Sequence, residues 1–517
     1  MAPLANYVSG RWSNGTGAGI PLLDPVTGEE LARVSSEGLD YGAALDHARG
    51  VGGPALRSMT YQERAQMLER IAQVLSSKRE SYYRIALENS GSPKSDAAID
   101  IEGAIFTLKY FARLGAALGP GTYLQEGDPT SLVKGDAYQS LHIGTALQGV
   151  AILINAFNFP AWGLWEKAAA ALLSGVPVLA KPASATAWLA QRMVEDVVSA
   201  SIVPPGTVSI SCGRAGDLLE HVEGRDVVLF TGSAETAQRI RSHSAITARS
   251  ARINVEADSL NAAILGPDAA GELAQLFVRE VIREMTVKAG QKCTAIRRIL
   301  VPQPLVEEVI QGLTAGLAAV IVGDPRDSKV QMGPLVSKAQ QEAVEAGIGE
   351  LARESTIVFG DAKTTDRPDT GAYVNPTLLL QREPYSAQAV HTTEVFGPVA
   401  TVMPYRDKQD AVRLAAKGRG SLVCSLFSDE PDFVQSVATE LAADHGRVHI
   451  VSTATGNAHT GHGNVMPMST HGGPGRAGGG QELGGLRALR LFHQFSAIQA
   501  PADAVRRLSE RAASYRL

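Results

Sequence analysis

The chain has few cysteines, few aromatic residues and no long hydrophobic run. Only three of its 517 residues are cysteines, and 5% are aromatic. Such a sparse, odd set of cysteines excludes the disulfide framework of small secreted domains, so we expect free thiols in a reducing cytoplasm. The sequence lacks a stretch of about 18 uninterrupted apolar residues, so we expect no membrane span. Its first residues lack a basic segment followed by an apolar run, so we expect no signal peptide.

The chain also lacks a strong charge of either sign. It carries 48 Lys and Arg residues against 53 Asp and Glu residues, a formal net charge of −5 at pH 7. That balance gives no general attraction to nucleic acid or to an anionic membrane surface. The length, with 44% hydrophobic residues, predicts a globular protein of two or three domains.

Short apolar runs alternate with helix-like segments between about residues 150 and 243. This alternation predicts a parallel sheet covered by helices, which is a Rossmann-like α/β domain. The strand-like runs are 150–154, 176–180, 208–211 and 227–230, and the helix-like segments include 165–174 and 186–199.

The rest of the chain falls into segments of different character. Residues 59–115 have the apolar spacing of helices, and a second α/β half is predicted from about residue 259 to residue 468. Residues 119–149 are polar and extended, which predicts a hairpin arm. Residues 454–485 are rich in Gly and His, a composition typical of a loop that backbone or a ligand approaches closely.

Cys293 and Glu256 are the first candidates for chemistry. A cysteine thiolate adds to an aldehyde and forms a thiohemiacetal, which donates hydride readily. A glutamate then activates water to hydrolyse the remaining thioester. Each residue alone is weak evidence, because a free cysteine is more often a small buried hydrophobic residue and a strand-end glutamate is more often structural.

Two further candidates follow predicted strands, where α/β proteins place ligands. The Asn158 amide would donate to a developing oxyanion together with the backbone N–H of Cys293; alternatively, Asn158 only forms a turn before proline. Backbone N–H groups and hydroxyls at a helix N-terminus, here Thr231, Gly232 and Ser233, would hold a dinucleotide pyrophosphate, although Thr and Ser are also ordinary helix caps. No GxGxxG motif follows any of the strands predicted above, so a standard Rossmann phosphate loop is not supported.

Together these segments resemble the aldehyde dehydrogenase superfamily over nearly the whole chain. The shared pattern comprises Asn-Phe-Pro at 158–160, Lys-Pro-Ala at 181–183, Phe-Thr-Gly-Ser at 230–233, the isolated Glu256, Gly-Gln-Lys-Cys at 290–293 and Glu-Val-Phe-Gly-Pro-Val at 394–399.

The resemblance implies an α/β fold with a Rossmann-like cofactor domain, an α/β catalytic domain and a β-hairpin oligomerisation arm. It also implies a homodimer or a dimer of dimers, because the arm of such proteins pairs with a neighbour's sheet. The implied divisions are residues 1–118 and 150–258 for the cofactor domain, 259–475 for the catalytic domain, and 119–149 and 476–517 for the arm and the C-terminal segment.

The resemblance further assigns roles to matching residues. Cys293 would be the nucleophile, Glu256 the base and Asn158 the oxyanion donor. We expect no metal ion, and we interpret Cys212 and Cys424 as structural. The remaining implied roles are Lys167 near the base in a proton relay, Lys181 and Glu394 on the cofactor riboses, Phe396 beside the nicotinamide ribose, and Thr231, Gly232 and Ser233 by the pyrophosphate.

Ser184 departs from the family's pattern. Members that prefer NAD carry Glu after Lys-Pro-Ala, and that carboxylate binds the ribose hydroxyls of the adenosine. Ser184 removes the repulsion against a 2′-phosphate, while Lys181 and Ser184 can both donate to it. We therefore expect NADP as the cofactor. The alternative is that discrimination is lost and NAD is accepted as well.

Residues 255–263 (VEADSLNAA) and 471–480 (HGGPGRAGGG) resemble a narrower branch of the family. That branch contains the dehydrogenase half of the phenylacetate ring-opening enzyme and the 3,4-dehydroadipyl-CoA semialdehyde dehydrogenase of aerobic benzoyl-CoA degradation. The sequence ends soon after the dehydrogenase region, so we expect the stand-alone benzoate-pathway enzyme to be the better match. Its CoA thioester substrate needs basic contacts, for which Arg476 and His471 are candidates; alternatively, Arg476 is solvated and the His471 loop serves packing.

Three other functions compete with hydrolytic oxidation of a CoA semialdehyde. One is a semialdehyde dehydrogenase of broad range or other specificity. Another is CoA-acylating oxidation, against which Glu256 argues because enzymes of that kind commonly lack this base. The third is a catalytically silent scaffold, which retention of Cys293, Glu256 and Asn158 makes improbable.

Overall fold

The computed structural model describes residues 3–360 and 370–516, and its first half is built on a seven-stranded sheet. The strand order is β11-β10-β7-β8-β9-β1-β2, parallel from β11 to β9 and antiparallel at β1 and β2. These strands are β1 (Asn6–Val8), β2 (Arg11–Ser13), β7 (Ala151–Ile154), β8 (Val178–Lys181), β9 (Val208–Ile210), β10 (Val227–Thr231) and β11 (Arg252–Glu256).

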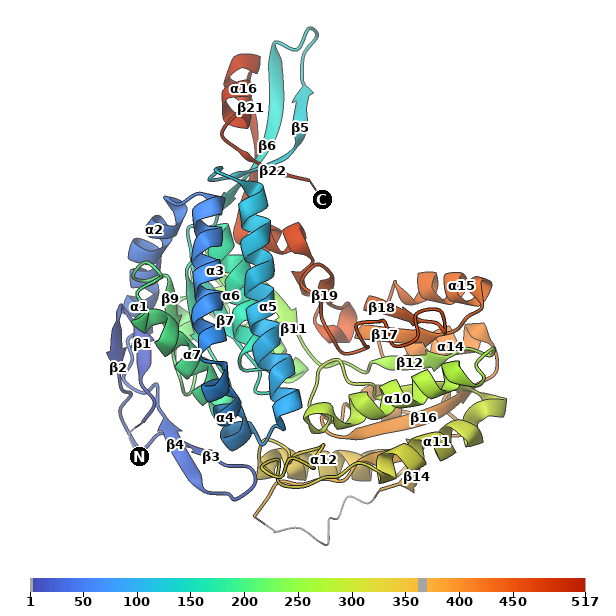
Figure 1. Cartoon of the computed structure of the whole chain (residues 1–517). Coiled ribbons are helices and arrows are strands. Elements are labelled where there is room, and N and C mark those ends of the chain that lie inside the picture. The colour runs from blue at the N-terminus through green and yellow to red at the C-terminus, as the bar shows by residue number, and fades with distance from the viewer. Residues whose placement is uncertain (1–2, 361–369, 517) are drawn as a thin grey trace.

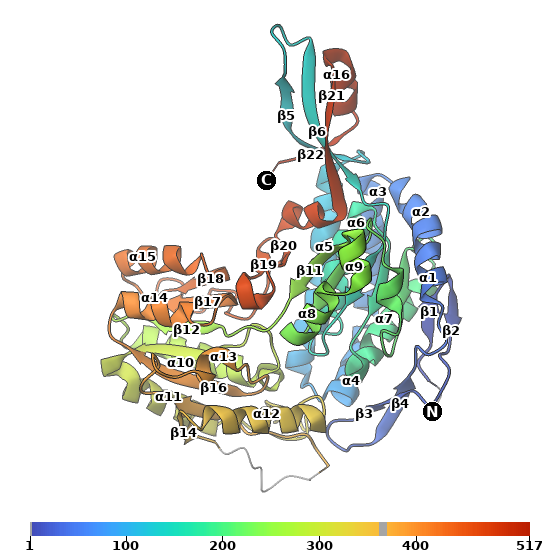
Figure 2. The same cartoon turned by 180° about the vertical axis from the view of Figure 1, so that it is seen from behind.

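Alternate side chains of these strands enter hydrophobic cores on opposite faces of the sheet. Ala151 and Leu229 belong to the core formed with helices α3 to α7, whereas Ile152 and Val228 belong to the core formed with α1, α8 and α9. Figure 1 has α3 and α5 in front, and Figure 2, from behind, brings α8 and α9 to the front. The helices are α1 (Tyr41–His47), α2 (Gly53–Arg57), α3 (Tyr61–Ser77), α4 (Arg79–Ser90), α5 (Lys94–Leu118), α6 (Trp162–Ser174), α7 (Ala187–Ser199), α8 (Ala234–Arg241) and α9 (Ser244–Arg249).

A second seven-stranded sheet, in the order β14-β15-β16-β13-β12-β17-β18, forms the other half. Helices α10 and α11 cover one face, and α12, α14 and α15 cover the other. The strands are β12 (Ala262–Leu265), β13 (Arg298–Pro302), β14 (Thr356–Phe359), β15 (Thr377–Leu380), β16 (Val399–Tyr405), β17 (Ser421–Phe427) and β18 (His445–Val451). The helices are α10 (Glu272–Thr286), α11 (Val306–Ala318), α12 (Lys338–Leu351), α13 (Ala389–Thr392), α14 (Lys408–Ala416) and α15 (Pro431–Leu441).

A four-stranded sheet, ordered β21-β6-β5-β22, projects from the body of the molecule (Figure 1). Its hairpin is β5 (Leu124–Ser131) and β6 (Tyr138–Ala146), inside the segment for which the sequence predicts a hairpin arm. The C-terminal segment supplies β21 (His493–Pro501), α16 (Ala502–Ser509) and β22 (Ala513–Tyr515). Two small hairpins complete the structure: β3 (Ile20–Leu23) with β4 (Glu30–Val34), and β19 (Thr470–Gly472) with β20 (Gln481–Leu483).

The α/β fold predicted from the sequence is therefore confirmed, including the parallel strands β7 to β11, the second α/β half and the long helices of residues 59–115. Helix α6 ends at Gly175, where a φ of 92° and a hypothetical Cβ only 2.3 Å from Arg64 Nη1 both demand glycine. Over the described part of the chain, no helix combines the length and the apolar character that crossing a membrane requires.

Candidate active site

The strands of the first sheet bring four predicted site segments to one edge. Ile154 of β7 pairs in register with Phe230 of β10 and Lys181 of β8, and Thr231 pairs with Glu256 of β11. These strands are parallel, so their carboxyl ends meet at the same edge. The loop with Asn158, the Lys181 segment, the Thr231 segment and Glu256 consequently lie together.

A pocket opens beside this edge. It is lined by residues at the edge of the first sheet, by helix α6, by the nucleophile loop before β13 and by the Gly- and His-rich segment. Six residues singled out from the sequence line it: Asn158, Lys167, Thr231, Glu256, Cys293 and His471. The other lining residues are Asn155, Ala156, Phe159, Trp162, Gly163, Glu166, Thr294, Gly463 and Val465.

The loop that carries Cys293 is fixed from two sides. Asn261 Nδ2 donates to the carbonyls of Cys293 and Ala295, at 2.8 and 3.0 Å. Arg297 donates to the carbonyls of Gly290 and Lys292, at 2.7 and 3.3 Å. Asn261 belongs to the 255–263 segment that resembles the narrower branch of the family, and its amide holds the nucleophile loop in place.

Gly290 is required where this loop turns. Its φ is 67°, and a Cβ would approach the carbonyl oxygen of Gly397 to 2.2 Å. The two preceding residues, Lys288 and Ala289, also have positive φ, at 54° and 51°. Non-glycine residues in this region store strain and are frequent at functional sites.

The Cys293 thiol lies against the Glu256 carboxylate. Burial raises the pKa of Cys293 well above its usual value, and the charge of Glu256 together with the hydrogen bond between the two groups raises it further. At rest the sulfur is therefore a protonated thiol with a base beside it. Proton removal by that base is what converts it to a nucleophile.

Glu256 is held between several polar groups. Its Oε1 accepts a hydrogen bond from His471 Nε2 at 3.1 Å, and its Oε2 lies 3.4 Å from Thr231 Oγ1. Burial raises the pKa of Glu256, but His471, Lys167 and the thiol lower it by more, so the carboxyl is anionic. Burial likewise lowers the pKa of His471, but Glu256 raises it by more. His471, predicted only as a substrate contact, is thus a direct partner of the candidate base.

Lys167 joins two further buried carboxylates. Its Nζ lies 2.7 Å from Glu166 and 2.9 Å from Glu482. Burial lowers the pKa of Lys167, but the carboxylates raise it by more, so it is a cation. One carboxylate oxygen each of Glu166, Glu256 and Glu482 lies within 4.8 Å of the others. Sequence analysis missed Glu166 and Glu482, because neither lies in a motif that it singled out.

Glu394 and Phe396 lie near the nucleophile loop, with the Arg297 guanidinium 5.6 Å from the centre of the Phe396 ring. Burial raises the pKa of Glu394 to about 7. Its Oε1 is shielded from solvent and has no hydrogen-bond partner among the described residues. An orphaned carboxyl oxygen of this kind fits a ligand that donates hydroxyl hydrogens, such as a ribose.

Lys181 and Ser184 lie where β8 ends. Lys181 Nζ donates to Pro182 O at 3.0 Å, and Ser184 Oγ donates to Gly213 O at 3.2 Å. The next residue, Arg214, is exposed. Sequence analysis missed Arg214, because only the fold brings residues 213–214 beside Ser184. The three donors form a basic, polar group at the sheet edge.

At the start of α8, Ser233 caps the helix by accepting from the backbone N–H of Thr236. The backbone N–H of Ala234 donates to Asp258 at 2.9 Å. An anionic group therefore already contacts the N-terminus of α8, the position expected for a pyrophosphate.

The structure does not bring Arg476 into the pocket. Its guanidinium donates to the carbonyls of His391 and Thr392 and lies 3.9 Å from Asp258. These contacts place Arg476 near Glu394 and Asp258, on the cofactor side, and they tie the loop after β19 to the second sheet. They do not support the interpretation of Arg476 as a substrate contact.

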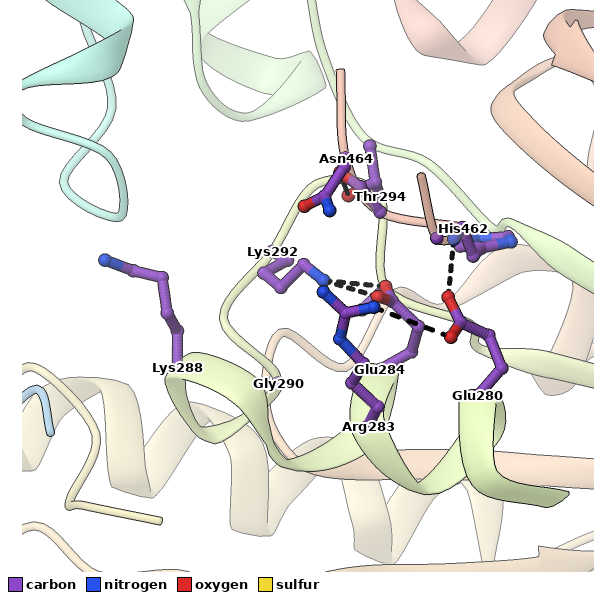
Figure 3. Close-up of polar contacts among 12 residues, drawn as sticks. Glu280, Arg283, Glu284, Lys288, Gly290, Lys292, Thr294, His462 and Asn464 are labelled. Atoms are coloured by element: carbon purple, nitrogen blue, oxygen red, sulfur yellow. Dashed lines mark hydrogen bonds and ion pairs between the residues drawn. The ribbon is translucent and has the colours of Figure 1, made fainter. Parts of the chain in front are cut away.

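A buried ionic network supports the pocket from behind (Figure 3). Lys292, next to the nucleophile, bonds both oxygens of Glu284 at 2.7 and 2.8 Å. Glu280, one turn earlier on α10, accepts from the backbone N–H of His462. Thr294 Oγ1 donates to Gly463 O at 3.1 Å. The network thereby connects α10, the nucleophile loop and the Gly- and His-rich wall of the pocket.

Comparison with known proteins identifies the class to which this fold and site belong. The model of the aldehyde dehydrogenase family matches residues 12–496. The chain belongs to the aldehyde dehydrogenase family.

The chain is also similar to individual members of the family, in sequence and in structure. The chain is 54% identical over 477 residues to a 3,4-dehydroadipyl-CoA semialdehyde dehydrogenase of Aromatoleum evansii, covering 91% of this chain and 93% of that one. It is 28% identical to a hydroxyisobutyraldehyde dehydrogenase of Mycolicibacterium austroafricanum, covering 96% and 93%. A double mutant of betaine aldehyde dehydrogenase from Staphylococcus aureus, solved with NAD+, superposes with a TM-score of 0.83 at 25% identity over 97% of each chain.

Proposed function

We propose that this aldehyde dehydrogenase oxidises 3,4-dehydroadipyl-CoA semialdehyde to the carboxylic acid with NADP+, as a step of aerobic benzoate degradation. The single observation that carries the chemistry is the position of the Cys293 sulfur within 4.8 Å of a carboxylate oxygen of the buried Glu256. The 54% identity to a relative of that name supports the substrate.

Acylation of the enzyme begins with a proton transfer. Glu256 takes the thiol proton, and the Cys293 sulfur adds to the aldehyde carbon to form a thiohemiacetal. The Asn158 amide and the backbone N–H of Cys293 donate to the oxygen that becomes anionic. Bound NADP+ supplies the hydride acceptor, and a thioester remains on Cys293.

Deacylation needs Glu256 in its anionic form again, so the proton taken from the thiol first passes from Glu256 to solvent. His471 donates to Oε1 of Glu256, and the positive charge of nearby Lys167 further stabilises the carboxylate anion. Glu256 then accepts a proton from water, and the water oxygen attacks the thioester to release the acid. The substrate's own CoA thioester survives, because attack occurs at the aldehyde end.

The side chains of this chain that would contact the cofactor fit a nicotinamide dinucleotide. Glu394, with its unpartnered oxygen, and Phe396 would hold the nicotinamide ribose. Thr231, Gly232 and Ser233 would lie by the pyrophosphate at the start of α8. Lys181, Ser184 and the exposed Arg214 would hold the adenosine ribose and its 2′-phosphate. Because Ser184 stands where NAD-preferring members carry Glu, no carboxylate repels the 2′-phosphate, which favours NADP over NAD.

CoA-acylating oxidation is the competing reaction, and the Glu256 contact argues against it. A silent scaffold would not need a thiol and a base in contact within an open pocket.

We further propose domains at residues 1–118 with 150–258 and at 259–475, and an oligomerisation arm at 119–149 with 476–517, which assembles a dimer or a dimer of dimers. A reducing cytoplasm suits the three free cysteines.

The test is NADPH formation by the purified protein. We expect activity with the CoA semialdehyde and NADP+ that Cys293→Ala abolishes, while Cys424→Ala, which removes a buried thiol of β17, retains it. Broad activity on simple aldehydes would keep the mechanism and overturn the benzoate assignment. Turnover that requires added free CoA would overturn Glu256 as the deacylating base.

A further inference from the structure

Three side chains of different chemistry converge at the floor of the pocket. The Cys293 Sγ, one carboxylate oxygen of Glu256 and one ring nitrogen of His471 all lie within 4.8 Å of one another. They come from the nucleophile loop, the end of β11 and strand β19, so only the fold brings them together. His471 Nε2 and Glu256 Oε1 are already 3.1 Å apart.

We propose that Cys293, Glu256 and His471 form a binding site for Zn²⁺, whose occupation inhibits the enzyme. Thiolate, imidazole and carboxylate are the ligands that zinc selects, at about 2.0 to 2.3 Å, with a fourth position left to water in an open site. Tetrahedral bonds of that length bring ligand atoms to about 3.5 Å from one another, so small side-chain rotations suffice. Cations such as Mg²⁺ prefer oxygen ligands and are disfavoured by the sulfur and nitrogen.

The electrostatics of the surroundings favour a dication. Glu166, Glu256 and Glu482 are all buried, and their oxygens cluster within 4.8 Å. Lys167 is the cation that contacts two of them, and His471 contacts the third. Zinc binding releases one proton from the thiol and leaves His471 as neutral imidazole. The two positive charges of the ion therefore replace the positive charges that leave with these protons.

The position of the three ligands in the pocket determines how zinc reaches them and what its binding does to the enzyme. The pocket that admits the aldehyde also leads to the three ligands. A bound zinc ion occupies the nucleophile and the base together, so it excludes the aldehyde from Cys293. Inhibition is therefore reversible by a chelator and competitive with the aldehyde, whichever aldehyde the enzyme oxidises.

The experiment measures binding directly in the resting enzyme and separately measures inhibition. Zn²⁺ is titrated by calorimetry, and Co²⁺ serves as a spectroscopic probe, because a thiolate ligand gives a charge-transfer band in the near ultraviolet. We expect one ion per chain, a band that Cys293→Ala abolishes, and no comparable effect of Mg²⁺. The calorimetric and spectroscopic readouts do not depend on turnover, so they test the site even if the proposed substrate is wrong.

A matched pair of variants isolates the histidine. His471→Gln removes one ligand, and we expect zinc affinity to fall by at least about tenfold. His221 makes the same kind of contact, 3.1 Å from Asp217, at the surface, so His221→Gln should leave the affinity unchanged. Circular dichroism confirms that each variant is folded. Unchanged affinity in both Cys293→Ala and His471→Gln, or inhibition that is not competitive with the aldehyde, would overturn the proposal.

Discussion

At the scale of single residues, Glu256 is governed by opposing neighbours. Burial favours its protonated form, whereas His471, Lys167 and the thiol of Cys293 stabilise the anion. The net effect keeps the base charged in a buried place where burial alone would neutralise it. The histidine therefore belongs to the machinery that sets the protonation of the base.

Replacing His471 should change the pH dependence of the reaction. In His471→Gln, burial is opposed by Lys167 and the thiol alone, so the pKa of Glu256 rises. We expect the acidic limb of the kcat/KM profile to move to higher pH, because the base is then protonated over a wider range. His221→Gln serves as the control, and an acidic limb that stays in place would contradict this role.

The proposed preference for NADP also rests on one residue. Ser184→Glu places a carboxylate where we expect the 2′-phosphate, and repulsion of that kind costs several kcal/mol. We expect kcat/KM for NADP+ to fall by about a hundredfold or more, with little loss for NAD+. Ser184→Ala, which removes only the hydroxyl, should lose much less. Equal losses with both cofactors would show that Ser184 does not face the phosphate.

At the scale of helices and strands, the sequence predicts the features that depend on residues close together in the chain. The β7–α6–β8 alternation and the stop at Gly175 follow from periodicity and chain chemistry, and the motif segments carry Cys293 and Glu256. The partners of these residues were not predictable in the same way. Glu482 reaches Lys167 from strand β20, far along the chain, and Arg476 looks like a free loop arginine until its contacts with the carbonyls of α13 are known.

The network behind the nucleophile loop makes a prediction about stability. Glu284→Gln leaves the ammonium of Lys292 buried without its ion-pair partner, and breaking such a pair costs about 3 to 5 kcal/mol. We expect a lower unfolding midpoint in urea together with reduced activity. Glu272→Gln changes an exposed residue in the first turn of the same helix and should have a small effect. Similar midpoints for the two variants would refute a supporting role for the network.

At the scale of the whole molecule, the projecting arm is the feature that a single chain does not explain. Its sheet stands away from both halves (Figures 1 and 2). Near its tip, Leu132 and Val133 are 44% and 47% exposed, although both are apolar. Exposed apolar side chains on a projecting sheet are what a subunit contact would cover.

Charge on the arm should therefore weaken assembly. We expect the double substitution Leu132→Asp and Val133→Asp to shift the protein to a smaller species in sedimentation velocity experiments. The body of the fold lies apart from the arm, so the variant should keep its helical circular dichroism. An unchanged sedimentation coefficient would mean that these side chains do not hold subunits together.

The central claim is that Cys293 carries the acyl group and that Glu256 drives its hydrolysis. The most direct measurement is the intact mass of Glu256→Gln after it has been mixed with the semialdehyde and NADP+. Removing the carboxylate also lowers the pKa of Cys293, because the charge of Glu256 is one cause of its elevation. Without the base the thiol loses its proton only to solvent, so we predict slow formation of one acyl group on Cys293, with NADPH formed in equal amount. Continued turnover without a covalent adduct would contradict the account.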